Sequence, residues 1–121
     1  MLKFFDILAL LFYCAVIYWF SGQPALPIPM LFEYQDKLHH FTAYFLMGIL
    51  AWRTIRHFVA LPFMLAIVSV VFCSLYGISD EWHQSFVEGR QADVWDWVAD
   101  TFGAAMAMVL LTRFYPYQKL N

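Results

Sequence analysis

Long apolar stretches and short polar stretches follow one another along the chain, and this pattern predicts its secondary structure. Four apolar segments stand out, at about residues 4–22, 38–52, 58–79 and 94–112. A helix needs about 20 residues to cross the hydrocarbon core of a bilayer, and the first and third segments meet that length directly. The second and fourth become polar at one end, which must lie at headgroup level or face other helices. Long runs without strict apolar–polar alternation favour helices over a barrel.

Proline residues separate the first apolar segment from the second. The connecting stretch reads QPALPIPM, and its prolines prevent the helix from continuing. The aromatic residues YWF stand where a cleaved signal peptide would have small residues, so we interpret the first segment as a retained span. The sequence therefore predicts an all-α membrane protein, in which residues 1–121 form one domain with four transmembrane helices in a compact bundle.

Composition indicates that lipid is the solvent of this chain. Hydrophobic residues make up 63% of the 121 residues and charged residues only 13%, about half the charged share of a soluble domain. A small water-soluble protein could not bury so much apolar surface, because small domains have too much exterior. Cys14 and Cys73 lie inside apolar runs, and we interpret both as packing residues.

The distribution of lysine and arginine predicts the orientation. If four helices alternate in direction, five of the seven basic residues lie on one side of the membrane. These five are Lys3, Arg53, Arg56, Arg113 and Lys119. Lys37 and Arg90 lie on the other side. Because basic residues are enriched in cytoplasmic loops, this distribution places both termini in the cytoplasm.

A polar stretch between the third and fourth apolar segments then faces out of the cytoplasm. It reads SDEWHQSFVEGRQADVWDWVAD and contains six of the nine acidic residues of the chain. Asp80 and Glu81 come near the C-terminal end of a predicted helix, where negative charge opposes the helix dipole. An acidic pair at that place needs an external partner, for which Arg90, Lys37, a histidine, a metal ion and a ligand are all candidates.

Helical spacing gathers the polar residues into stripes. In the second segment, a residue every four positions forms the stripe Asp36, His40, Tyr44 and Gly48. In the fourth, steps of three and four give the stripe Asp93, Asp96, Asp100, Gly103 and Ala107, acidic at its outer end and small at its inner end. In the third, Tyr76, Asp80 and Gln84 share a face.

We expect these stripes to converge at the outer end of the bundle into one polar pocket. The candidate residues are Asp36, Lys37, His40, Tyr44, Asp80, Glu81, Gln84, Arg90, Asp96 and Asp100. Alternatives remain for some of them, because Asp36 and Asp93 also suit helix N-caps. We assign no metal site and no cofactor, although a transition metal held by His40, Glu81 and Asp96 is an alternative.

Two stretches of this sequence resemble the VanZ-like family of small bacterial membrane proteins. In DKLHHFTAYFLMGIL, Asp36, Lys37, His40 and Tyr44 match the family's first signature in order and spacing. In DEWHQSFVEGRQADVWDWVADTFGA, the residues that match its second signature are Asp80, Glu81, Gln84, Gly89, Arg90, Asp96 and Gly103. The family carries Asn where this chain carries Asp100, so a carboxyl group replaces the amide donor there.

The resemblance implies a multi-pass protein of the bacterial cytoplasmic (inner) membrane that serves the cell envelope. The family takes its name from a protein linked to resistance to teicoplanin, a glycopeptide antibiotic. We expect the outward pocket to bind an envelope component such as an anionic lipid headgroup or a cell-wall precursor. A membrane-embedded enzyme that acts on a lipid-linked phosphate or glycan is one alternative, and a proton or ion pathway is another. No basic patch predicts a nucleic-acid partner.

Overall fold

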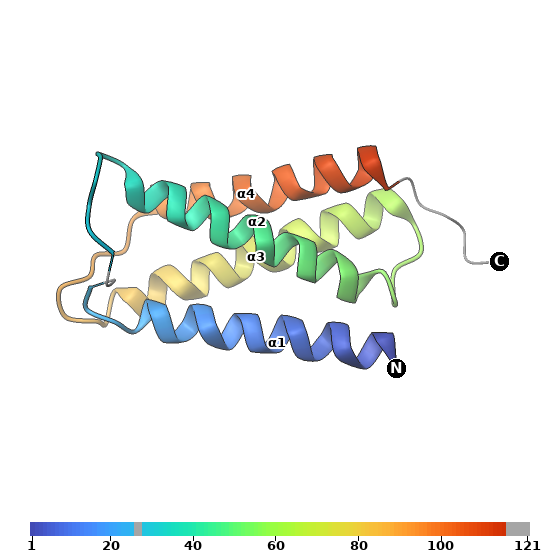
Figure 1. Ribbon diagram of the computed structural model, residues 1–121, viewed down its shortest axis with the longest axis horizontal. Helices are drawn as coiled ribbons and strands as arrows, with labels where there is room; N and C mark the ends of the chain where they lie inside the picture. Colours follow the sequence, from blue (N-terminus) through green and yellow to red (C-terminus); the bar gives the residue numbers. More distant parts are fainter. Residues whose placement is uncertain (26–27, 116–121) are drawn as a thin grey trace.

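Four α-helices make up the structure, a computed structural model that describes residues 1–25 and 28–115 (Figure 1). They are α1 (Leu2–Ser21), α2 (Gln35–Ile55), α3 (Pro62–Gln84) and α4 (Val94–Phe114). The described residues contain no strand, so the expected all-α class is confirmed. Lys119, one of the basic residues used to predict the orientation, lies outside the described residues.

Two helices differ from the expected segments in ways that affect the candidate site. Helix α2 begins at Gln35 rather than at residue 38, so Asp36 and Lys37 lie in its first turn. Helix α3 begins at Pro62 rather than at residue 58, because proline is suited to the first position of a helix. It continues past residue 79 to Gln84, which places Asp80 and Glu81 on the helix itself.

Successive helices run in opposite directions, as Figure 1 shows. The beginning of α1 and the end of α4 therefore lie at the same end of the bundle. The beginnings of α2 and α4 and the end of α3 lie together at the opposite end. This up-and-down order brings the acidic parts of three helices to one end, although they are far apart in the sequence.

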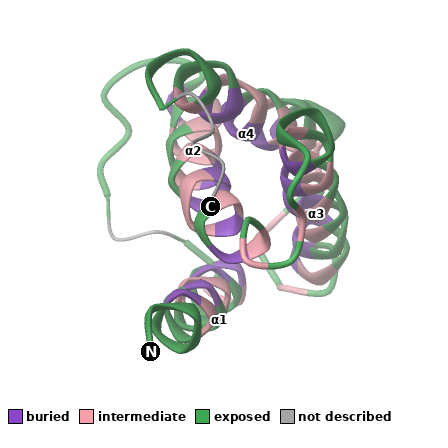
Figure 2. Cartoon of the chain, turned by 90° about the vertical axis from the view of Figure 1, so that its right-hand side faces the viewer, coloured by how far each residue is buried: buried purple, intermediate pink, exposed green. Residues whose placement is uncertain are grey.

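The surface of the bundle is suited to lipid. The helices contain 20 to 23 residues, which corresponds to lengths of roughly 30–35 Å. Helices α1, α3 and α4 are long and apolar enough to cross a membrane. Large apolar side chains such as Leu75, Phe102 and Val109 are exposed on the outer faces, whereas Ser69 and Asp100 are completely buried. Figure 2 shows the buried residues on the inward faces of α2, α3 and α4. Apolar patches of this extent mark a membrane-facing surface.

Small residues allow α2 and α4 to approach closely. A Cβ atom added at Gly48 would lie 3.2 Å from the Cα atom of Ala104, and one added at Gly103 would clash with the carbonyl oxygen of Phe41. Small residues at a helix interface let two backbones come together in this way. The expected packing role of the small stripe on the fourth segment is thus confirmed.

Polar contacts attach α1 to the rest of the bundle at its N-terminal end. The buried Asp6 side chain accepts hydrogen bonds from Nε and Nη2 of Arg53 at 3.0 and 2.8 Å. Its second oxygen lies 2.8 Å from Nε2 of His57, and the Thr54 hydroxyl donates to its backbone oxygen at 3.0 Å. Because Asp6 is compensated by the end of α2, a charge inside an apolar segment holds two helices together.

Further along α1, two tyrosine hydroxyls tie it to its neighbours. Tyr13 donates to the carbonyl oxygen of Ala43 in α2 at 2.8 Å. Tyr76 of α3 donates to the carbonyl oxygen of Cys14 at 2.6 Å. Helix α1 therefore packs against both α2 and α3, and it forms one wall of the pocket described below.

The Gly103 contact predicts a specific sensitivity to a single methyl group. We expect Gly103→Ala to destabilise the protein by about 1–3 kcal/mol, because the added atom meets backbone and forces α2 and α4 apart. Gly22→Ala is the matched control, since its Cβ would lie 3.4 Å from a His83 ring atom, an ordinary contact. Thermal unfolding of the two variants in detergent measures the difference. Equal melting temperatures would contradict the close approach.

Candidate functional site

Four acidic side chains are buried at the end of the bundle where α2 and α4 begin and α3 ends. Asp80 is 6% exposed, Glu81 8%, Asp96 6% and Asp100 0%. Acidic residues are almost never buried to this degree unless they are paired. All four belong to the set predicted from the sequence, so the partners of each carboxylate determine what the site can do.

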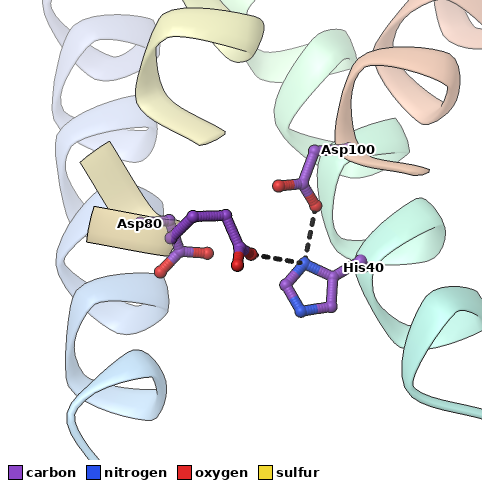
Figure 3. Close-up of side chains that lie close together, drawn as sticks. His40, Asp80 and Asp100 are labelled. Carbon is purple, nitrogen blue, oxygen red and sulfur yellow. Dashed lines mark hydrogen bonds and ion pairs between the residues drawn. The ribbon is translucent and has the colours of Figure 1, made fainter. Parts of the chain in front are cut away.

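His40 of α2 lies between these acidic side chains. Its Nδ1 atom is 2.7 Å from Oδ1 of Asp100, a hydrogen-bond distance. The same nitrogen is 3.9 Å from Oε1 of Glu81, and Nε2 is 3.6 Å from Oδ2 of Asp96. Figure 3 shows His40, Asp80 and Asp100 reaching the same space from α2, α3 and α4. The stripes predicted on three separate helices thus meet at one imidazole ring.

Asp80 and Glu81 find their partners on neighbouring helices. The Tyr44 hydroxyl donates to Oδ2 of Asp80 at 3.2 Å. The backbone N–H of Asp93 donates to Oε2 of Glu81 at 2.8 Å. Among the described residues, neither Arg90 nor Lys37 forms an ion pair with Asp80 or Glu81. The prediction that Arg90 or Lys37 forms an ion pair with Asp80 or Glu81 is therefore wrong.

A second acidic group surrounds Lys37, and we call it the Lys37 cluster. The Nζ atom lies 2.8 Å from Oδ2 of Asp36, 2.6 Å from Oδ2 of Asp93 and 2.8 Å from Oδ1 of Asp96. These contacts join the first turn of α2 to the first turn of α4. Asp93 also caps α4 by accepting a hydrogen bond from the backbone N–H of Trp95, so the N-cap alternative holds for this residue. The cap interpretation of Asp36 is wrong, because the N-cap position of α2 is Tyr34.

A pocket of about 510 Å³ opens between α1, α2 and α3 beside these groups. Five of the predicted residues line its polar end: His40, Tyr44, Asp80, Gln84 and Arg90. Apolar side chains line most of the remainder, among them Val16, Ile17, Phe20 and Leu38. The other predicted residues do not line it. Asp36, Lys37 and Asp96 belong to the Lys37 cluster, and Glu81 and Asp100 are buried beside His40. The single pocket expected from the sequence is thus divided into a pocket and a Lys37 cluster.

Two contributors to the site were not among the predicted residues. Asp93 supplies both an oxygen to Lys37 and an N–H to Glu81. Gly77 makes room for Asp100, because a Cβ atom at Gly77 would lie 2.9 Å from Oδ2 of Asp100. Gly77 is three positions before Asp80, so helical spacing gave a signal for it. No signal in the sequence pointed to the second contact of Asp93, which depends on how α3 meets α4.

A comparison with protein-family models identifies the family of this chain. The model described as VanZ/LLP1 matches residues 5–115, which include every candidate site residue. The chain belongs to the VanZ/LLP1 family. This confirms the resemblance drawn from the two sequence motifs, and with the apolar helices it identifies a VanZ-family membrane protein. No curated protein and no solved structure matched the chain.

The Lys37 cluster generates a prediction about stability. Replacing Lys37 with methionine leaves three carboxylates close together without their cation. We expect this substitution to lower the free energy of unfolding by about 2 kcal/mol. Breaking a fully buried ion pair costs roughly 3–5 kcal/mol, and the cost is smaller here because the Lys37 side chain remains 25% exposed. Arg113→Met, an exposed position at the opposite end of the bundle, is the control. Thermal unfolding in detergent at pH 7 measures both variants.

The pH dependence of that difference follows from Asp93. The hydrogen-bonded Lys37 ammonium lowers the pKa of the Asp93 carboxyl below its ordinary value of 3.8. A lowered folded-state pKa contributes stability that is present at neutral pH and is lost as the pH falls through that pKa. The gap between wild type and Lys37→Met should therefore be largest near pH 7 and shrink below about pH 4. A gap independent of pH would contradict the ion-pair explanation.

Proposed function

We propose that this VanZ-family protein crosses the bacterial cytoplasmic membrane four times and binds a lipid-linked anionic molecule of the cell envelope. The single observation that carries the proposal is the pocket, which has apolar walls and one polar end. That form suits an amphiphile, with its hydrocarbon chain along α1 and its head beside His40 and Arg90. Ligand pockets in general combine apolar walls with a few polar groups that fix orientation.

The neutralised charges of α2 support its role as a fourth span. It contains 21 residues, the same number as α4. Lys37 near its beginning is surrounded by acidic side chains, and Arg53 near its end is bound to Asp6. Ionisable residues in a span are tolerated where they face the bundle and pair with one another. The lower hydropathy of α2 is therefore compatible with crossing beside α1, α3 and α4.

The orientation rests on the basic residues. Lys3, Arg53, Arg56 and Arg113 lie toward the end of the bundle where the chain begins, and basic residues favour the cytoplasmic side. The pocket and the Lys37 cluster would then lie beneath the outer surface of the membrane. A wall precursor or an anionic headgroup would reach the polar end from there. A contribution to glycopeptide resistance, the role from which the family takes its name, is compatible with such a position.

Arg90 supplies the feature that selects an anion. It lines the pocket, and within residues 1–25 and 28–115 its guanidinium has no ion-pair partner. Guanidinium groups recognise phosphate through paired hydrogen bonds, which are stronger than those between neutral groups. A phosphate at this position would compensate the charge of Arg90.

Enzymatic action on the bound molecule is a second candidate function. It is favoured by His40, which lies 2.7 Å from Asp100 and also lines the pocket, where it could transfer a proton to a bound phosphate ester. A proton pathway has less support. The buried residues of α2 between Tyr44 and Thr54 are Met47, Gly48 and Ala51, and none of them is titratable.

The proposed topology predicts opposite labelling of two loops. In a background without Cys14 and Cys73, Glu88→Cys lies in the loop between α3 and α4, and Arg56→Cys lies in the loop between α2 and α3. A membrane-impermeant maleimide should label the Glu88 position in cells with an intact inner membrane. It should label the Arg56 position only after that membrane is permeabilised. The reverse pattern would refute the orientation.

Lipid binding is tested with paired variants on the purified protein in detergent. We expect Arg90→Ala to weaken binding of phosphatidic acid about tenfold, the effect of one lost charged hydrogen bond. Arg113→Ala is the matched control. Val16→Trp should fill the pocket and weaken binding as well, whereas Val109→Trp on the outer surface should not. Equal affinity in the wild type and both pocket variants would remove the proposal.

A further inference from the structure

Four buried carboxylate oxygens at the site have no hydrogen-bond partner within the described part of the chain: Oδ1 of Asp80, Oε1 of Glu81, Oδ1 of Asp96 and Oδ2 of Asp100. Oδ1 of Asp96 lies 2.8 Å from Nζ of Lys37. The remaining three, on Asp80, Glu81 and Asp100, have no basic group that close. Buried polar atoms are nearly always hydrogen-bonded, because leaving one unpaired costs the free energy of its lost hydration. Each of these acids has one oxygen engaged and one free. Three such atoms in one place call for a shared partner.

The neighbouring Lys37 cluster shows what such a partner does. There, one cationic atom lies within 2.8 Å of Asp36, Asp93 and Asp96. Asp80, Glu81 and Asp100 form a second group of three acids, which is more deeply buried. Its neighbouring side chain is the His40 imidazole, which is 2.7 Å from Asp100 but 3.9 Å from Glu81. One acidic group thus has a cation in contact with all three of its acids, whereas the basic side chain of the other group is within hydrogen-bond distance of Asp100 alone among its three acids.

We propose that His40, Asp80, Glu81 and Asp100 bind a divalent transition-metal ion. One ligand atom from each residue lies within 4.8 Å of the corresponding atoms of the others. Metal–ligand bonds of about 2.0–2.2 Å place two ligands on opposite sides of an ion at roughly 4.2 Å. The four groups therefore need only small side-chain movements, among them a widening of the contact between His40 and Asp100, to surround one ion.

The ligand types indicate which ion fits. Carboxylates suit magnesium, calcium and manganese, whereas imidazole suits zinc, iron and other transition metals. One imidazole nitrogen with three carboxylates therefore favours Mn²⁺, Fe²⁺ or Zn²⁺. The three carboxylates carry a formal charge of about −3 when ionised, and a divalent ion leaves about −1. Such an ion compensates most of the buried charge.

The atoms around this group would hold the ligands in place. Tyr44 donates to the second oxygen of Asp80, and the N–H of Asp93 donates to the second oxygen of Glu81. Nε2 of His40 faces Asp96 at 3.6 Å, which leaves Nδ1 directed at the group. Metal-binding histidines commonly direct their other nitrogen to a carboxylate, and such outer partners orient the ligands.

The site adjoins the pocket, because His40 and Asp80 line both. An ion held there would lie at the polar end of the pocket with room for a further ligand. A phosphate oxygen could occupy that position while Arg90 contacts the same group. This link to phosphate rests on the proposed function, whereas the metal site itself does not.

The test uses the purified full-length protein in detergent, stripped with a chelator and titrated with Mn²⁺ or Zn²⁺ in the absence of lipid. We expect one ion per chain after desalting and a higher melting temperature when metal is present, because a ligand that binds the folded state stabilises it. Pulsed electron paramagnetic resonance of the Mn²⁺ form should show coupling to one imidazole nitrogen. Folded wild-type protein that takes up no stoichiometric metal would overturn the proposal.

Paired variants distinguish this site from the Lys37 cluster. Asp80→Asn and Asp100→Asn conserve shape and should weaken metal binding about tenfold or more. Asp36→Asn is the matched control and should bind as wild type does, because the Asp36 carboxylate already pairs with Lys37 at 2.8 Å. Equal loss in all three variants would place the ion elsewhere and refute the assignment. If the ligand variants do not fold, the stoichiometry and nitrogen coupling of the wild type still decide the question. Phosphatidic acid retention with and without metal then tests the lipid proposal separately.

Discussion

The close approach of α2 and α4 determines the geometry of the site. Gly103 leaves space for the backbone of Phe41, and Gly48 lies against Ala104. With the two backbones this close, His40 comes within 2.7 Å of Asp100. A larger side chain at either glycine would separate the histidine from the carboxylate. The site therefore depends on the absence of side chains at positions that carry no chemistry themselves.

Polar contacts hold this bundle together at both ends. In a membrane, apolar burial gives little preference for one helix neighbour over another, because lipid is as apolar as a leucine side chain. Asp6 with Arg53 and His57 joins α1 to α2 at one end. Lys37 joins α2 to α4 at the other end. These pairs give the helices a specific arrangement that apolar packing alone would not select.

The two acidic groups at the end of the bundle where α2 and α4 begin differ in their partners and in their exposure. The Lys37 cluster carries its own cation and is partly exposed, so it works as a structural clamp between helix N-termini. The group around His40 is more deeply buried and borders the pocket. Because this second group has free carboxylate oxygens beside a cavity, it is the group to which we assign binding.

Local periodicity in the sequence determined the helical class and much of the candidate set. Apolar runs fix where helices form in lipid, and steps of three and four fix which residues share a face, so the stripes of His40, Asp80 and Asp100 were predictable. The partners were not. Whether Asp80 pairs with Arg90 or with Tyr44, and whether Asp36 caps a helix or binds Lys37, depends on the distance and rotation between helices. Those quantities come from side-chain packing among residues far apart in the chain, and only the tertiary structure decided them.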